Sequence, residues 1–247
     1  MRIAIVGGKG TLGRLVTAEL GRRGHEARVL SRSGDYRVDL TTGAGLTAAL
    51  AGCDAVLDAS NAQKNARAVL VEGSRRLLAA EMAAGVAHHV CVSIIGCDQV
   101  PIGYYKVKTE QEDVIANGSV PWSTVQATQF HELAATALAA VARFGILPVP
   151  RMKIQTIAAA EVATAIAGIA TAAPVRGRVR VAGPHIETAA ELARTWRRVT
   201  GRKALLVRVP VPGRLGRVLR GGGLTERQPD IRGTISFGDW LAAGAAI

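Results

Sequence analysis

The sequence predicts an α/β fold built on a doubly wound parallel sheet. Residues 1–14, MRIAIVGGKGTLGR, pass from a β-branched apolar run through a glycine loop into a helical pattern. Strand patterns and helical patterns then alternate as far as the helix expected from Phe130, as in a parallel sheet with right-handed crossovers. The segments 54–59 and 88–95 are nearly all apolar, which is typical of strands covered on both faces. These three observations favour a Rossmann-type dinucleotide fold.

The glycine loop after the first strand is expected to hold a pyrophosphate. Gly7, Gly10 and Gly13 permit a tight turn, a close approach of the backbone to phosphates, and close packing of helix on strand. The N–H groups at the start of the following helix, with the positive end of its dipole, attract the same anion. The spacing is not G-x-G-x-x-G and no Gly-Lys-Ser/Thr closes a P-loop, so a plain strand-to-helix turn stays the alternative.

A helix over 11–23 leads to the second expected strand, 27–30, which ends in LSRSG. In a dinucleotide fold this strand end faces the adenosine ribose, where an acid bonds the hydroxyls and an arginine accepts a 2′-phosphate. Arg32 occupies this place, and no acid follows until Asp35. The sequence therefore favours NADP over NAD, with an exposed turn arginine as the alternative.

A short third strand, 36–40, would bring Asp39 and Leu40 near the adenine. After a helix at 44–51, the buried strand 54–59 ends in a polar segment. Ligands bind at the carboxyl ends of such strands, so this segment is expected to line the cofactor trench, although turn formation alone would also explain it. The polar residues are Ser60 and Asn61, and Ala59 at the end of the strand is expected to line the trench with them.

The rest of the chain continues the alternation and then becomes less regular. Helices are expected at about 64–84, 104–117, from 130, 158–172 and 187–199, and strands at 88–95, 122–127, 178–182 and 204–209. A Gly/Arg-rich segment follows at 213–223. We expect a single unit over 1–247, in which about 1–150 form the dinucleotide-binding core. Residues from about 151 to 247 would mainly form a small α/β substrate lobe interleaved with that core.

Tyr104 and Lys108 are four residues apart on an expected helix and so lie on one face of it. Ser93 lies near the end of the preceding strand. Such a set suits carbonyl reduction by a nicotinamide: the lysine holds the cofactor ribose and lowers the tyrosine pKa, the tyrosine gives a proton to the substrate oxygen, and the serine bonds that oxygen. Tyr105 and Lys106 are adjacent residues of the same types.

The formal net charge of +12 allows nucleic acid, an anionic membrane or a phosphate-bearing ligand as partner. Much of the excess lies at 176–180 and 194–203, without interleaved aromatic residues or a nucleic-acid motif. We expect a solvated basic surface and no specific nucleic-acid binding.

The cysteines suggest reduced thiols in a cytoplasm, because their number is odd and no C-x-x-C occurs. They are Cys53, Cys91 and Cys97. His88 and His89 would point to opposite faces of a strand, so no metal site is expected. The N-terminus does not resemble a signal peptide, and 157–175 is too weakly apolar for a membrane span.

Several segments together resemble the atypical short-chain dehydrogenase/reductases, specifically the NmrA-like NAD(P)-binding proteins. The segments are GGKGTLG, LSRS, AGCDAVLDAS, AAGVAHHVCVSIIG, YYKVKTEQE, WSTVQATQFHE, IQTIAAAEVA and VAGPHIETAAELARTWRRVTGRK. The resemblance implies a Rossmann core with a C-terminal substrate lobe. It also implies NADP(H) binding through Gly7, Lys9, Gly10, Thr11, Leu12 and Arg32. Gln126 stands where relatives usually have arginine.

Members of this group often keep the lysine and lose the tyrosine or serine, and some sense the dinucleotide or reduce quinones without a tyrosine acid. From the glycine loop, Arg32 and the Tyr104–Lys108 pair, we expect an NADPH-dependent oxidoreductase that transfers hydride to a small carbonyl or quinone-like compound. A non-catalytic NADP(H) sensor that binds a protein partner is the alternative, and a nucleic-acid-associated protein is a weaker third. We expect a small-molecule substrate and no binding to a membrane, and a homo-oligomer stays possible.

Overall fold

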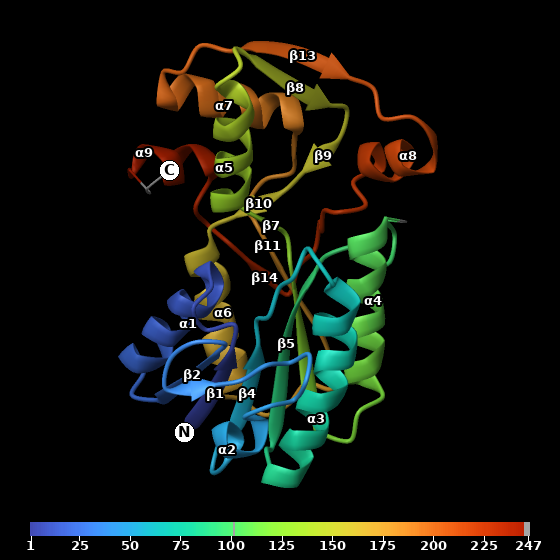
Figure 1. Ribbon diagram of the computed structural model, residues 1–247. Helices are drawn as coiled ribbons and strands as arrows, with labels where there is room; N and C mark the ends of the chain where they lie inside the picture. Colours follow the sequence, from blue (N-terminus) through green and yellow to red (C-terminus); the bar gives the residue numbers. More distant parts are fainter. Residues whose placement is uncertain (101, 245–247) are drawn as a thin grey trace. The chain divides into compact units, whose positions relative to one another are not determined.

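The computed structural model describes residues 1–100 and 102–244 (Figure 1). The chain divides into two compact units. The first comprises Met1–Ser93, Ile102–Gln126 and Val162–Val179. The second takes in the described residues of the ranges Ile94–Pro101, Ala127–Glu161 and Arg180–Ile247.

The first unit contains most of a mainly parallel sheet whose order is β3-β2-β1-β4-β5-β6-β11-β14. The last strand, β14 (Ile231–Arg232), belongs to the second unit and pairs in parallel with Val181 and Ala182 of β11. The other strands are β1 (Arg2–Val6), β2 (Glu26–Ser31), β3 (Tyr36–Arg37), β4 (Ala55–Asp58), β5 (His88–Ile94), β6 (Trp122–Ala127) and β11 (Gly177–Ala182). Ile3 of β1 lies opposite Ala27 of β2 and Ala55 of β4, in parallel register on both sides. The doubly wound fold is confirmed.

The strand order reverses at β1, because β2 and β3 extend the sheet to one side and β4 to β6 to the other. In open α/β sheets this switch point is where a crevice forms outside the carboxyl ends of the strands. The residues that follow β1 and β4 are therefore the first place to look for a ligand site.

Helices cover the sheet of the first unit. They are α1 (Thr11–Arg22), α2 (Leu46–Leu50), the π-helical turn η1 (Arg67–Val71), α3 (Glu72–Ala84), α4 (Gly103–Ala116) and α6 (Ala159–Ala170). Figure 1 shows α1 beside α6 on one face and α3 beside α4 on the other, and the Arg23 side chain after α1 donates to the Thr164 carbonyl in α6 at 3.1 Å. Leu30, Leu50 and Leu77 are fully buried in the core between sheet and helices. This packing fixes β1 and β4, the strands at the switch point, between the helices on the two faces of the sheet.

Besides β14 and the end of β11, the described residues of the second unit form three two-stranded ladders and four helices. The ladders pair β8 (Ile146–Pro150) with β13 (Leu205–Val209), β9 (Lys153–Ile154) with β12 (Glu187–Thr188), and β7 (Gln129–Phe130) with β10 (Thr156–Ile157). The helices are α5 (His131–Ala142), α7 (Ala189–Thr200), α8 (Gly213–Gly221) and α9 (Phe237–Ala242). Trp196, Phe237 and Trp240 form the centre of its core.

Several boundaries differ from the sequence expectations. The third strand covers only Tyr36–Arg37 because Val38 and Leu40 turn into the core. The helix expected over 64–84 begins with the π-helical turn η1. The Gly/Arg-rich segment contains α8, in which only Leu215, Val218 and Leu219 are apolar and the other residues are glycines and arginines. Most other elements agree to within about two residues, which is the usual uncertainty of helix ends.

Candidate functional site

The glycine loop joins the carboxyl end of β1 to the start of α1. Gly7 has a φ of 75°, and a Cβ there would lie 2.7 Å from the Ala59 carbonyl oxygen after β4. Only glycine fits this turn without moving the neighbouring strand end, because the conformation is left-handed and the space is filled by backbone. The loop is closed by the Gly10 amide, which donates to the Gly7 carbonyl at 2.9 Å.

The start of α1 leaves room for an anion. Gly10 is the N-cap and supplies no side-chain cap, and the first turn contains no acid. A Cβ at Gly13 would meet the Gly7 carbonyl and would lie 2.6 Å from the Gly8 Cα, so the helix can approach the loop only with glycine at this position. Thr11 is exposed and Leu12 is buried beside it. Uncapped helix N–H groups with no competing carboxylate are what a pyrophosphate requires.

The Lys9 side chain reaches from the glycine loop to the turn after β2, where Arg32 lies. The Lys9 ammonium donates to Ser33 Oγ at 3.1 Å, which fixes it beside the turn that carries Arg32. Arg32 is exposed, so its guanidinium can meet solvent or a ligand. Two cations therefore flank the strand end where a dinucleotide presents its adenosine ribose.

Asp39 and Leu40 occupy different environments. The Asp39 carboxylate accepts from the Thr41 amide at 2.8 Å and from its hydroxyl at 2.6 Å, and these bonds, with a smaller contribution from Arg32, lower the pKa of Asp39. Leu40 is 7% exposed and packs against Gly73 of α3. The Leu40 side chain thus belongs to the core, so only its backbone could face an adenine.

The residues after β4 lie directly across from the glycine loop. The Ala59 amide donates to the Val6 carbonyl at 3.0 Å, and the Ser60 amide donates to Asp58 Oδ1 at 2.9 Å. Ser60 Oγ is buried without a hydrogen-bond partner among the described residues. A buried hydroxyl without a partner is costly, and a ligand bound at the carboxyl ends of β1 and β4 would satisfy it.

Lys108 is 3% exposed and is held by two acceptors. Its Nζ donates to the Val92 carbonyl of β5 at 2.7 Å and to Gln111 Oε1 at 2.6 Å. The Gln111 amide in turn donates to Asp58 Oδ2 and to Ser74 Oγ, each at 3.1 Å. This network fixes the ammonium on α4 relative to the ends of β4 and β5. The neighbouring Lys106 is exposed, whereas Lys108, which the spacing to Tyr104 favours, is buried.

Tyr104 lies in the first turn of α4, and its hydroxyl donates to Asn61 Oδ1 at 2.7 Å. Burial is the largest cause that raises the pKa of Tyr104 to about 12, with a smaller effect of Tyr105. The expectation that Lys108 lowers this pKa is wrong in this structure, because the ammonium is directed to Val92 and Gln111. The phenol is therefore firmly protonated at neutral pH.

Ser93 is 3% exposed and follows Val92 directly on β5, next to the carbonyl that holds Lys108. The structure thus joins Tyr104 to the segment after β4 and Lys108 to β5. A cavity of about 580 Å³ opens beside Tyr104 and is lined by Gln63, Asn65, Ala66, Arg67, Ala68, Gly103, Tyr104 and Val107.

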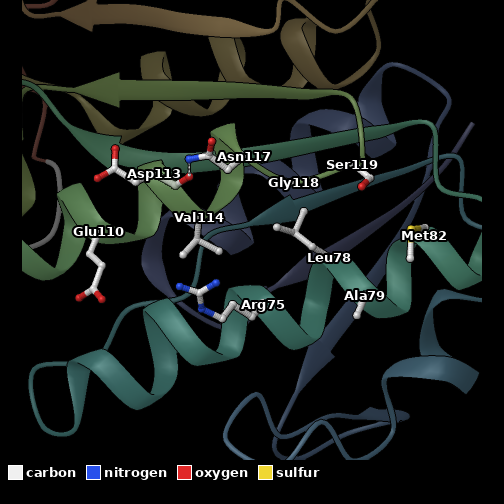
Figure 2. Close-up of a pocket in the computed structure, with 10 residues that line it drawn as sticks. All are labelled: Arg75, Leu78, Ala79, Met82, Glu110, Asp113, Val114, Asn117, Gly118 and Ser119. Carbon is white, nitrogen blue, oxygen red and sulfur yellow. Dashed lines mark hydrogen bonds between the residues drawn. The ribbon is translucent and has the colours of Figure 1, made fainter.

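A second hollow in this unit, of about 440 Å³, lies between α3 and α4 (Figure 2). Leu78 and Met82 come from α3, Val114 comes from α4, and Gly118 and Ser119 lead into the start of β6. One end of the hollow is therefore beside the amino end of a strand, away from the edge where the glycine loop lies. Its position does not suit the cofactor chemistry argued above.

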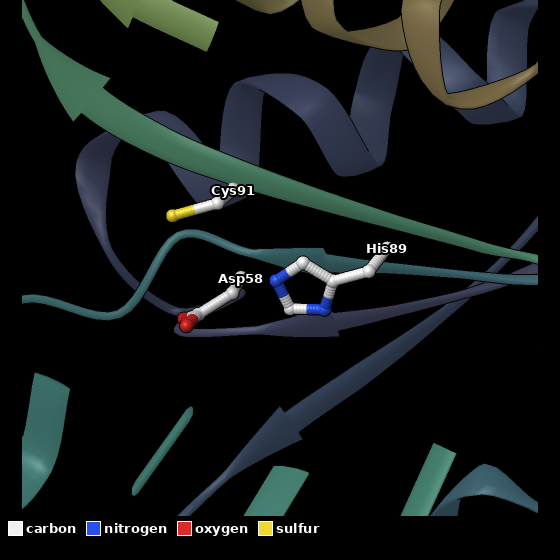
Figure 3. A group of neighbouring side chains, drawn as sticks. All are labelled: Asp58, His89 and Cys91. Carbon is white, nitrogen blue, oxygen red and sulfur yellow. The ribbon is translucent and has the colours of Figure 1, made fainter. Parts of the chain in front are cut away.

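Asp58, His89 and Cys91 form a buried polar cluster that sequence reasoning did not connect (Figure 3). Their ligand atoms lie within 4.8 Å of one another. Burial by itself lowers the pKa of His89, but the Glu81 carboxylate, whose Oε1 is 2.8 Å from Nδ1, and a contact with Cys91 hold this pKa well above its usual value. Asp58 already accepts from Ser60, Ser74 and Gln111. We interpret the cluster as a structural one, in which buried polar groups hold the ends of β4 and β5 in place. The signal in the sequence that could have revealed it is Asp58, an acid within the apolar segment DAVLDAS.

Glu112 of α4 joins two strands of the same unit. Gln126 of β6 donates to both Glu112 oxygens at 3.0 and 3.1 Å, and Arg178 of β11 donates to Glu112 Oε2 at 2.8 Å. Gln126 therefore has a structural partner in Glu112.

A family model described as NAD(P)H-binding matches residues 7–173. The chain belongs to this NAD(P)H-binding family. The match begins at Gly7 and extends beyond Lys108, so it includes the glycine loop and the buried lysine, and residues 7–173 contain an NAD(P)H-binding domain. No curated protein matches the chain.

Solved structures share the fold of this NAD(P)H-binding protein at low sequence identity. The Escherichia coli NADPH-dependent quinone oxidoreductase QOR2, complexed with NADPH, is 19% identical with a TM-score of 0.83, over 99% of this chain and 100% of that one. A Staphylococcus aureus nucleoside-diphosphate-sugar epimerase is 14% identical with a TM-score of 0.81, over 98% and 100%. An Agrobacterium tumefaciens short-chain dehydrogenase/reductase superfamily protein with bound NAD is 19% identical with a TM-score of 0.74, over 99% and 97%.

Within the described part of the chain, no helix is both long and apolar enough to cross a membrane.

Proposed function

We propose that this protein is an NADPH-dependent oxidoreductase of the atypical short-chain dehydrogenase/reductase, NmrA-like type, which reduces a small carbonyl or quinone-like compound. The observation that carries the proposal is the placement of Lys108. Its ammonium is buried and held by Val92 and Gln111, four residues after Tyr104 on α4. A buried, fixed cation of this kind beside a dinucleotide crevice suits cofactor binding and carbonyl reduction.

The residues around the crevice fit NADPH. The α1 start and the loop glycines Gly7, Gly10 and Gly13 would hold the pyrophosphate, and the unpartnered Ser60 hydroxyl would gain a partner. Lys9 and Arg32 would meet the 2′-phosphate, which favours NADPH over NADH. Asp39 and the Leu40 backbone would border the adenine, and Asn61 and Lys108 the nicotinamide end. The structurally similar Escherichia coli protein is an NADPH-dependent quinone oxidoreductase, in agreement with this choice.

When bound, NADPH supplies a hydride to the substrate carbon. Tyr104 then gives the balancing proton from its hydroxyl to the substrate oxygen, which replaces Asn61 Oδ1 as hydrogen-bond acceptor. Ser93 would donate a hydrogen bond to the same oxygen. Lys108 supplies positive charge that favours the negative charge developing there. The three cysteines are buried and form no disulfide among the described residues, which agrees with the cytoplasmic location that we propose.

The second candidate is a non-catalytic NADP(H) sensor. The specific observation in its favour is the engagement of the Tyr104 hydroxyl by Asn61, together with burial that raises the pKa of Tyr104 to about 12. A weak acid that already has a hydrogen-bond partner is a less effective proton donor. The sensor would bind NADPH without turnover.

The deciding experiment follows NADPH oxidation by the parent, Tyr104→Phe and the neighbouring control Tyr105→Phe, each with one carbonyl and one quinone. If Tyr104 is the acid, Tyr104→Phe loses carbonyl turnover by roughly a hundredfold or more, while its NADPH affinity stays nearly unchanged and Tyr105→Phe resembles the parent. Quinone turnover that survives in Tyr104→Phe identifies hydride transfer without a protein acid. Tight NADPH binding with no turnover of either compound supports the sensor and contradicts the oxidoreductase.

A further inference from the structure

A basic hollow of about 420 Å³ lies within the second unit, and none of the residues that line it belongs to the candidate cofactor site. Five cationic side chains line it: Arg151, Lys153, Arg194, Arg208 and Arg220. They come from the β8–β9 turn, β9, α7, β13 and α8, so the charge is gathered by the fold and not by one run of sequence.

The hollow has little negative charge to offset these cations. Among the described residues, none of the five forms an ion pair with a carboxylate. Glu191 is the single acid that lines the hollow, and its Oε2 accepts from the Thr188 amide at 2.7 Å and the Thr188 hydroxyl at 2.8 Å in the capping box of α7. A concave wall with unpaired like charges concentrates a positive potential.

Backbone hydrogen bonds hold the segments that carry these cations. The Arg151 amide donates to the Val209 carbonyl at 3.3 Å, and Arg208 lies opposite Val149 in the β8–β13 ladder. Lys153 pairs with Thr188 in the β9–β12 ladder. The Arg220 guanidinium donates to the Val211 carbonyl at 3.0 Å through Nη1. The positions from which the cations project are therefore set before any ligand arrives, which lowers the entropy cost of binding.

We propose that this hollow is a second ligand site, which binds a small anion with several phosphate groups. Four of the five cations are arginines, whose planar guanidinium groups pair with phosphate oxygens through two parallel hydrogen bonds. The volume is within the range of small-molecule sites. Trp196, the one aromatic residue of α7, is fully buried in the core, so the hollow lacks the exposed stacking surface of a single-strand binder.

The test is calorimetric titration of the full chain with inorganic tripolyphosphate at physiological salt, in the presence and absence of NADPH. Arg194→Gln combined with Arg208→Gln removes two charges from the hollow. Arg214→Gln combined with Arg217→Gln removes the same number from exposed positions of α8 that do not line it. We expect the first pair to weaken binding at least tenfold and the second pair to change it less than about twofold. Thermal unfolding of both proteins confirms that they are folded.

Three results would overturn the proposal. The parent could fail to bind tripolyphosphate at physiological salt, or both double variants could weaken binding equally, as diffuse electrostatic attraction requires. A short single-stranded oligonucleotide that binds the parent more tightly than tripolyphosphate would show that the surface serves nucleic acid instead. Binding that is retained with NADPH present and lost in Arg194→Gln/Arg208→Gln separates this site from the glycine loop, whatever the outcome for the oxidoreductase.

Discussion

At the scale of single residues, the choice of cofactor depends on Arg32 and its surroundings. The side chain is exposed after β2, and the neighbouring Ser33 hydroxyl accepts from Lys9 at 3.1 Å. The positive charge of Arg32 also contributes to lowering the pKa of Asp39, because it attracts the Asp39 carboxylate. A 2′-phosphate arriving here would meet a guanidinium with no competing salt bridge among the described residues.

We predict that the parent binds NADPH at least tenfold more tightly than NADH, since about 1.4 kcal/mol is within reach of one bidentate arginine–phosphate contact. Arg32→Ala should remove most of this preference and leave NADH binding nearly unchanged. Arg37→Ala, which removes an exposed guanidinium from β3, is the matched control. Calorimetric titration of both cofactors measures the effect. Equal affinities in the parent, or a preference that disappears with Arg37 instead, would contradict the role of Arg32.

At the scale of elements, β1, the glycine loop and α1 were predictable because their signals are local. Ile3 to Val6 are apolar and β-branched or small, and the glycines follow at once. The second unit was less predictable. Strands β9, β10 and β12 contain two residues each, too few for a period, and Pro148 and Pro150 argue against a strand where β8 lies.

The candidate site was likewise predictable only where its signal is local. The spacing of Tyr104 and Lys108 indicates one helix face, but the hydroxyl of Tyr104 bonds Asn61, 43 residues away, and Gln111 bonds Asp58, 53 residues away. These partners depend on tertiary packing, which a pattern along one element does not encode. The spacing along α4 therefore predicts a lowered pKa for Tyr104, whereas burial in the folded chain raises it.

Close packing of α1 on the glycine loop leads to a prediction for this element. Gly13→Ala places a Cβ 2.6 Å from the Gly8 Cα and 2.9 Å from the Gly8 carbonyl carbon, and backbone cannot move aside cheaply. We expect a loss of roughly 1–3 kcal/mol in the free energy of unfolding, together with weaker NADPH binding. Gly21→Ala lies on the same helix, and its Cβ meets nothing within 4 Å, so it should be neutral or stabilising by up to about 1 kcal/mol. Denaturant titration with and without NADPH compares the two, and equal stabilities would contradict the packing argument.

At the scale of the whole molecule, the cations behind the formal charge of +12 differ in whether they pair with acids. Many arginines of the first unit form ion pairs, such as Arg2 with Glu26, Arg23 with Glu19 and Arg178 with Glu112. The cations of the basic hollow in the second unit have no such partners among the described residues. Surface charge of one sign raises self-repulsion, and the repulsion grows as acid protonates further groups. The stability of this protein should therefore depend on pH, and buried histidines should contribute to that dependence.

His88 gives the sharpest test of this dependence. It is 3% exposed, its Nε2 is 2.9 Å from Ser123 Oγ, and burial is the main cause that lowers its pKa to about 4. An unfolded histidine has a pKa of about 6.5, so between these two values the unfolded chain binds a proton that the folded chain does not. The stability that neutral His88 contributes is present above the unfolded pKa and is lost as the pH falls toward 4. From pH 7 to pH 5 this loss amounts to about 2 kcal/mol.

We predict that the difference in unfolding free energy between pH 7 and pH 5 is smaller in His88→Gln than in the parent by about this amount. Glutamine keeps a polar group toward Ser123 and cannot take up the proton. His89, whose pKa is raised by Glu81, contributes with the opposite sign near pH 7, but it is present in both proteins and cancels in the comparison. His185→Gln, at an exposed position, is the control and should follow the parent. Urea unfolding at the two pH values measures all three proteins, and a parent and His88→Gln with the same pH dependence would mean that His88 is not the group that titrates.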